Sequence, residues 1–164
     1  MASKGLRIAS LILRILTFIF IFISLLIVAT NSKTAFKGTE LEKKVDFSDF
    51  NSYRYLIAVT VIGGALSLLQ IAFNIYHLVT KGEGTPLFYV FSDQLLAYLL
   101  LSAASAGLGA GIDLRVNVKL LLEDDYYNSF FDKGNAGSAI LLLAFICSAI
   151  VSVLSSLALI RKPV

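Results

Sequence analysis

Long apolar stretches separated by polar segments dominate the pattern of this chain. They run over 8–30, 55–79, 87–112 and 136–160. Each is long enough for an α-helix to cross the ~30 Å hydrocarbon core of a bilayer. Lipid offers no partner for exposed backbone N–H and C=O groups, so each stretch is expected to be a helix. The pattern therefore predicts an all-α membrane protein, with a four-transmembrane-helix bundle as one domain over 1–164.

Composition supports this class. Of 164 residues, 57% are hydrophobic and 15% charged, against roughly 45–50% and 25% in soluble domains. Lys4 and Arg7 precede the first apolar stretch as they would in a signal peptide. That stretch is longer than a signal-peptide core, and no small-residue cleavage motif follows it. We therefore expect the first helix to be retained.

The polar segments predict the topology. An even number of spans places both termini on one side, and Lys4, Arg7, Arg161 and Lys162 at the two ends favour the cytoplasm. The long connections 31–54 and 113–135, expected outside, nevertheless carry more Lys and Arg than the termini and the short second connection together. Because acidic residues contribute little to orientation, the basic residues of these connections oppose this assignment.

The third connection allows two structures. Leu114, Val116, Val118 and Leu120 alternate with polar residues, which is the period of a half-buried strand. The same segment also fits an extension of the third helix beyond the bilayer. The acidic run 123–125 that follows resembles a calcium site only in its charge, since the spaced acids and turn glycine of an EF-hand are missing. We interpret that run as a solvated acidic surface.

Two charges interrupt the apolar stretches, Arg14 in the first and Asp93 in the third. Each lies six residues inside its stretch, so both are about 9 Å deep from the same membrane face. An ionisable group at that depth is costly and usually faces a bundle interior or a water-filled cavity. We expect the two side chains to form an intramembrane ion pair.

Small residues indicate where helices approach one another closely. In the third stretch they recur every four residues, and the fourth stretch repeats the spacing with serines. Such faces let backbones pack closely, either within one chain or between chains. The predicted packing residues are Ala103, Gly107, Gly111, Ser148, Ser152 and Ser156.

The sequence carries no catalytic framework. The motifs of zinc proteases, phosphate-binding loops and nucleophile elbows are absent. Cys147 is the single cysteine and lies within an apolar stretch, so it offers no disulfide or metal site. We predict a protein that is not an enzyme and has no catalytic, cofactor-binding or metal-binding residues. A proton or ion transporter using Asp93, with His77 as a second proton carrier, is the alternative from a different class.

The stretch FSDQLLAYLLLSAASA over 91–106 resembles the third span of plant Casparian strip membrane protein-like (CASP-like) proteins, a family related to the MARVEL four-span proteins. An arginine in the first span and an aspartate in the third recur in that family, and Arg14 and Asp93 match them. The resemblance implies a multi-pass plasma-membrane protein with cytoplasmic termini and two outer loops. It also implies homo-oligomers and hetero-oligomers with related members that form membrane scaffolds and recruit cell-wall-modifying enzymes.

The chain departs from the best-known members of that family. It lacks the first-loop signature of the endodermal subgroup, any Trp, and any Cys in either long loop, which puts a role in the Casparian strip itself in doubt. The predicted function is a non-enzymatic scaffold whose partners are the lipid bilayer, family members and wall enzymes, with no nucleic acid. A trafficking adaptor of the MARVEL type is the third hypothesis.

Overall fold

A computed structural model describes residues 4–35, 43–80, 86–122 and 128–160. Within them lie four α-helices, α1 (Lys4–Ala29), α2 (Asn51–Thr80), α3 (Pro86–Leu122) and α4 (Asn128–Ile160). All four contain a segment long and apolar enough to cross a membrane. The predicted fold class, an all-α four-transmembrane-helix bundle, is confirmed.

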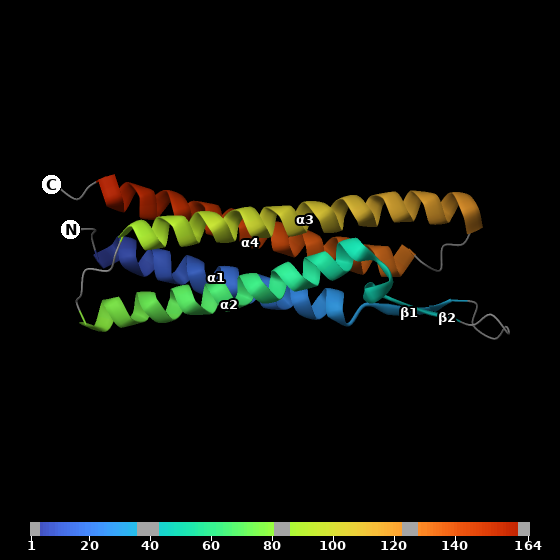
Figure 1. Cartoon of the computed structure of the whole chain (residues 1–164), viewed down its shortest axis with the longest axis horizontal. Coiled ribbons are helices and arrows are strands. Elements are labelled where there is room, and N and C mark those ends of the chain that lie inside the picture. Colours follow the sequence, from blue (N-terminus) through green and yellow to red (C-terminus); the bar gives the residue numbers. More distant parts are fainter. Residues whose placement is uncertain (1–3, 36–42, 81–85, 123–127, 161–164) are drawn as a thin grey trace.

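The four helices run along one long axis (Figure 1). The start of α1 and the end of α4 lie at one end, with the end of α2 and the start of α3; we call it the terminal end. Helix α1 packs against α2 and α4, and α3 packs against the same two helices. Helices α1 and α3 therefore occupy opposite corners of the bundle.

Each helix buries residues at alternating three- and four-residue spacing. This is the 3.5-residue period of helices that pack at shallow angles with interlocking side chains. On α1 the buried positions are Arg14, Thr17, Ile21, Ser24, Val28 and the following Asn31; on α2 they include Tyr53, Leu56, Thr60, Gly63, Ser67 and Gln70. The α1 set is largely polar, so lipid would solvate this face poorly and the bundle must cover it.

The opposite end of the bundle, which we call the hairpin end, carries a short β-hairpin. Strands β1 (Ser32–Ala35) and β2 (Lys43–Asp46) pair antiparallel, with Ser32 opposite Asp46. The 3-10 helix η1 (Phe47–Asp49) then leads into α2. Asn31 anchors the start of this segment, because its side-chain N–H donates to the carbonyl oxygen of Phe130 at 2.8 Å.

Helices α3 and α4 are longer than the apolar pattern predicted. The third helix continues to Leu122, so the strand interpretation of 114–120 is wrong and the helix-extension interpretation is correct. The segment 113–122 contains no Gly or Pro, and Leu, Arg and Lys are good helix formers. Leu114 packs on the core. Helix α4 begins at Asn128, before the predicted start at 136. In this added part of α4, Asp132 Oδ1 lies 3.0 Å from Arg115 Nη1.

Candidate functional site: a charge cluster that joins all four helices

Arg14 and Asp93 meet across the diagonal of the bundle. The Arg14 Nη1 atom lies 2.6 Å from Asp93 Oδ1, and Nη2 donates to Oδ2 at 2.7 Å. Their exposed fractions are 3% and 1%. This fork-to-fork geometry is the strongest form of an arginine-carboxylate contact. The pair directly connects α1 and α3, the two helices at opposite corners.

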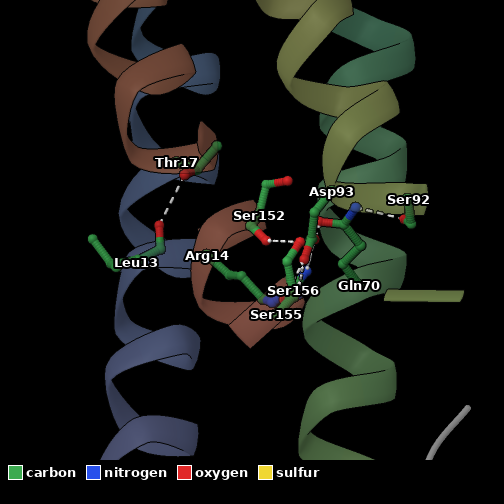
Figure 2. A network of polar contacts seen from close by, with 9 residues as sticks. All are labelled: Leu13, Arg14, Thr17, Gln70, Ser92, Asp93, Ser152, Ser155 and Ser156. Atoms are coloured by element: carbon green, nitrogen blue, oxygen red, sulfur yellow. Dashed lines mark hydrogen bonds and ion pairs between the residues drawn. The ribbon is translucent and has the colours of Figure 1, made fainter. Parts of the chain in front are cut away.

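The other two helices also contribute to this cluster (Figure 2). Gln70 of α2 accepts a hydrogen bond from Arg14 Nη1 at 2.9 Å through its Oε1 atom. Its amide Nε2 donates to Ser92 Oγ at 2.6 Å. From α4, Ser155 Oγ donates to Asp93 Oδ2 at 2.6 Å. We call Arg14, Gln70, Ser92, Asp93 and Ser155 the charge cluster.

The cluster lies in the half of the bundle nearest the terminal end. Counted from the helix tips there, its members are roughly 8–15 Å deep at 1.5 Å per residue. An aromatic ring covers one side, since the Arg14 guanidinium carbon lies 5.5 Å from the centroid of the Tyr89 ring. Arg14 Nε is buried and has no hydrogen-bond partner among the described residues. Both carboxylate oxygens of Asp93 accept from protein donors.

Sequence reasoning missed Gln70 and Ser155. A neutral amide or hydroxyl in an apolar stretch is far less costly than a charge, so it stands out less. Spacing carried a usable signal for Gln70, which falls on the same buried three-and-four pattern as Ser67 and Gly63. Ser155 lies one residue before Ser156, a packing residue in the sequence-based prediction. The serine that contacts Asp93 is therefore Ser155, the neighbour of the predicted Ser156.

The small residues of α3 face the interior of the chain. Ala103 is fully buried. A side-chain carbon at Gly107 would collide with Ser138 of α4 and Leu56 of α2, and one at Gly111 with Asn135. These three residues form a seam within one chain. On α4, Ser148 is buried, whereas Ser152 and Ser156 are half-buried and linked by a hydrogen bond from Ser156 Oγ to the Ser152 carbonyl oxygen at 2.9 Å.

The remaining candidates are not members of the charge cluster, although His77 contacts Tyr89, the ring that covers Arg14. His77 stacks edge-on against Tyr89 with ring centroids 6.0 Å apart, and its Nδ1 atom has no partner among the described residues. Cys147 is a free, half-buried thiol. Among the described residues, no group of His, Cys, Asp and Glu could hold a metal ion. The acidic run 123–125 lies outside the described residues.

These features define a class: multi-pass membrane proteins with four helices joined by a buried charge cluster. The model of the Casparian strip membrane protein domain matches residues 3–147. The chain belongs to this family, so the resemblance to CASP-like proteins is confirmed.

Several curated relatives match nearly the whole chain. CASP-like protein 4D1 of Ricinus communis is 40% identical over 96% of this chain and 94% of its own length. CASP-like protein 4D1 of Glycine max is 37% identical over 98% and 92%. CASP-like protein 4D2 of Arabidopsis thaliana is 37% identical over 98% and 94%. No solved structure matches the chain.

Proposed function

We propose that this protein is a non-enzymatic scaffold of the plasma membrane. It associates laterally with copies of itself and with related family members, and its outer loops recruit partners such as cell-wall-modifying enzymes. The observation that carries the proposal is the charge cluster, because one buried ion pair and its hydrogen bonds link all four helices in one arrangement. A rigid bundle suits a protein that must present fixed surfaces to its neighbours. Membership of the Casparian strip membrane protein family supports the same function.

In this proposal both termini are cytoplasmic and the hairpin end faces outward. Lys4 and Arg7 lie at the terminal end, and basic residues close to a short terminus favour the cytoplasm. The hairpin end then presents two elements outside the membrane, the β-hairpin and the last turns of α3 (Figure 1). These are the elements that would contact outer partners.

The contacts of Asp93 favour a scaffold over a transporter. A carboxylate that carries protons or ions must exchange its ligands during the transport cycle. Here both oxygens of Asp93 are held by Arg14, and one also by Ser155. The positive guanidinium in bidentate contact also disfavours a cation at the same place. These contacts support a structural role for Asp93, which links helices, over a role in transport.

Photobleaching of a fluorescently tagged copy at its native site tests the proposal. We expect little recovery of fluorescence, because a scaffold of associated bundles diffuses slowly. The tagged protein should also migrate as an oligomer in mild detergent. Free diffusion together with a purely monomeric species would refute the scaffold.

The Asp93→Asn variant separates the scaffold from a transporter. The asparagine side chain keeps the shape of the aspartate but loses the charge that pairs with Arg14. A scaffold predicts weakened assembly and no proton or ion flux through wild type. A transporter predicts intact assembly and lost flux, so flux through wild type that vanishes in this variant would contradict our proposal.

A further inference from the structure

In the middle of the bundle, the exposed face of α3 differs from those of the other three helices. Helix α2 exposes phenols only nearer its ends, at Tyr55 and Tyr76. Within 8–26 of α1, 58–73 of α2 and 136–157 of α4, all exposed side chains are apolar. Helix α3 instead exposes an amide, a phenol and two hydroxyls, followed by a glycine. We call these residues the polar face of α3: Gln94, Tyr98, Ser102, Ser105 and Gly109.

These residues share one side of the helix. Their spacing of four, four, three and four residues keeps them on a single face, which extends about 22 Å along α3 at 1.5 Å per residue. Ser102 Oγ is hydrogen-bonded to the Tyr55 hydroxyl of α2 at 2.8 Å, so the polar face extends onto the neighbouring helix. Tyr98 is 69% exposed.

Of the residues on the polar face of α3, Gln94 has the largest free-energy cost when its side chain is exposed to lipid. It follows Asp93 and so lies level with the charge cluster, inside the membrane-spanning part of α3. The contacts of the described residues include no partner for its amide. Lipid tails cannot replace the hydrogen bonds that water gives to this group. Between its exposed neighbours Phe91 and Leu95, the amide therefore favours a protein partner over lipid.

Gly109 lies on the opposite side of the helix from the internal seam. A side-chain carbon built at Gly109 meets no atom within 4 Å, whereas the same addition at Gly107 collides with two other helices. The fold of the single chain therefore does not explain a glycine at 109. A glycine on an exposed membrane face leaves room for the backbone of another helix to approach closely.

We propose that the polar face of α3 is the surface through which two copies of this chain associate. The inference rests on the proposed scaffold function and names its contact surface. Two copies in one membrane share orientation and depth, so a two-fold axis along the membrane normal brings the two Gln94 residues together. A primary amide both donates and accepts, so it is complementary to its own copy. Ser105 and Gly109 then face their counterparts deeper in the membrane.

Disulfide trapping tests this interface. Cys147 is the only cysteine of the chain, so the Cys147→Ser variant gives a cysteine-free background. Into it we introduce Ser105→Cys or, as matched controls on exposed positions of α1 and α4, Ile12→Cys or Val153→Cys. Because a disulfide needs Cα atoms within about 7 Å, mild oxidation in membranes should give a covalent dimer with Ser105→Cys alone. Trapping at either control as efficiently as at Ser105 would overturn the proposal.

Variants of the face provide a second measurement. Gln94→Leu should weaken self-association by about 3- to 30-fold, as expected for one interhelical hydrogen-bond contact in a membrane. Gly109→Leu should weaken it as well by blocking close approach, without lowering the melting temperature of the single chain. Wild-type association that both variants leave unchanged would overturn this interface but not the scaffold. A wild type that is monomeric at all concentrations in lipid would overturn both.

Discussion

Arg14 and Asp93 each depend on the other because both are withdrawn from water. A buried ion pair gains little over a well-packed apolar pair, since desolvation offsets most of the attraction. Removing one partner is different, because the survivor stays charged with no counter-ion. The pair is therefore better understood as a device that specifies which helix faces meet than as a large net source of stability.

Single and double replacements of this pair should differ in a characteristic order. Asp93→Ala or Arg14→Ala alone should lower the free energy of unfolding by about 3–5 kcal/mol, the range for an orphaned buried charge. The double variant Arg14→Leu with Asp93→Leu should lose less than either single variant. The readout is the fraction of monodisperse protein that survives heating in mild detergent, followed by size-exclusion chromatography.

The exposed pair Arg115 and Asp132 provides the matched control, because their side chains are 45% and 57% exposed. Breaking it with Asp132→Asn should change stability by only about 0–1 kcal/mol. The exchanged variant, Arg14→Asp with Asp93→Arg, should regain part of the loss caused by either single charge removal. A double Leu variant less stable than both single variants would show that the pair contributes net stability.

Tyr53 makes a second residue-scale prediction. Its ring is fully buried against Phe50 and Phe130, with centroids 5.9 and 6.1 Å away. Its hydroxyl has no hydrogen-bond partner among the described residues. Removing an unsatisfied buried hydroxyl relieves a desolvation cost, so Tyr53→Phe should leave stability unchanged or raise it by up to about 1 kcal/mol.

The control for this prediction is Tyr53→Ala, which removes the ring as well and should cost about 3–5 kcal/mol. Both variants are compared by thermal unfolding in the same detergent. If Tyr53→Phe is destabilised nearly as much as Tyr53→Ala, the hydroxyl must hold a partner that stabilises the fold.

Some residues of the charge cluster can be predicted from the sequence, and others cannot. Arg14 and Asp93 can be recognised in isolation, because a charge inside an apolar stretch is expensive wherever the helix points. Spacing can place Gln70 on the buried face of its helix, but the roles of Gln70 and Ser155 follow only from the atoms they contact in the assembled bundle. Those contacts depend on how far the helices are shifted and rotated relative to one another. The local pattern of apolar and polar residues along the sequence contains little information about either.

At the scale of the elements, α3 is where close packing is most strictly required. Gly107 and Gly109 are two residues apart on one helix and face opposite surroundings. Gly107→Ala should destabilise the bundle by about 1–3 kcal/mol, because the added methyl group overpacks the contact with Ser138 and Leu56. Gly109→Ala should be neutral or stabilise the helix by up to about 1 kcal/mol, owing to the higher helix propensity of alanine.

These two variants are matched in chemistry and in helix, so their difference reports packing alone. Thermal unfolding of both in the same lipid or detergent gives the comparison. Equal effects at the two positions would mean that the seam between α3, α2 and α4 is looser than the structure indicates.

The apolar pattern predicted the existence of the four helices but not their ends. Hydropathy reports where lipid begins, whereas a helix ends where its backbone hydrogen bonds stop. Helix α3 therefore continues past residue 112 through a segment without breakers, and α4 starts at Asn128 rather than 136. The alternating apolar residues from Leu114 suggested a strand, but the propensity of the segment and its continuity with a long helix prevailed. The β-hairpin had no clear apolar alternation and was not predicted.

At the scale of the whole molecule, the bundle has two unlike ends. The terminal end carries only helix tips among the described residues, and the charge cluster lies in its half (Figure 1). The hairpin end carries the β-hairpin, the last turns of α3 and the ion pair between Arg115 and Asp132. A scaffold that recruits outer partners would contact them at the hairpin end, while the charge cluster links the helices within the membrane.

The orientation of the bundle gives the last prediction. A glycosylation acceptor site introduced within 36–42, next to the β-hairpin, should be modified in the secretory pathway, because the proposal places the hairpin end outside. The same acceptor site introduced within 81–85, between α2 and α3, should stay unmodified. A pH-sensitive fluorophore fused to either terminus should not respond to external acid, whereas the same fluorophore within 36–42 should respond at once.

The reverse pattern would place the Lys and Arg residues of the two long connections in the cytoplasm, which is the arrangement that their larger number favours. It would leave the four-helix bundle and its charge cluster unchanged, but it would refute the proposed outward orientation of the hairpin end.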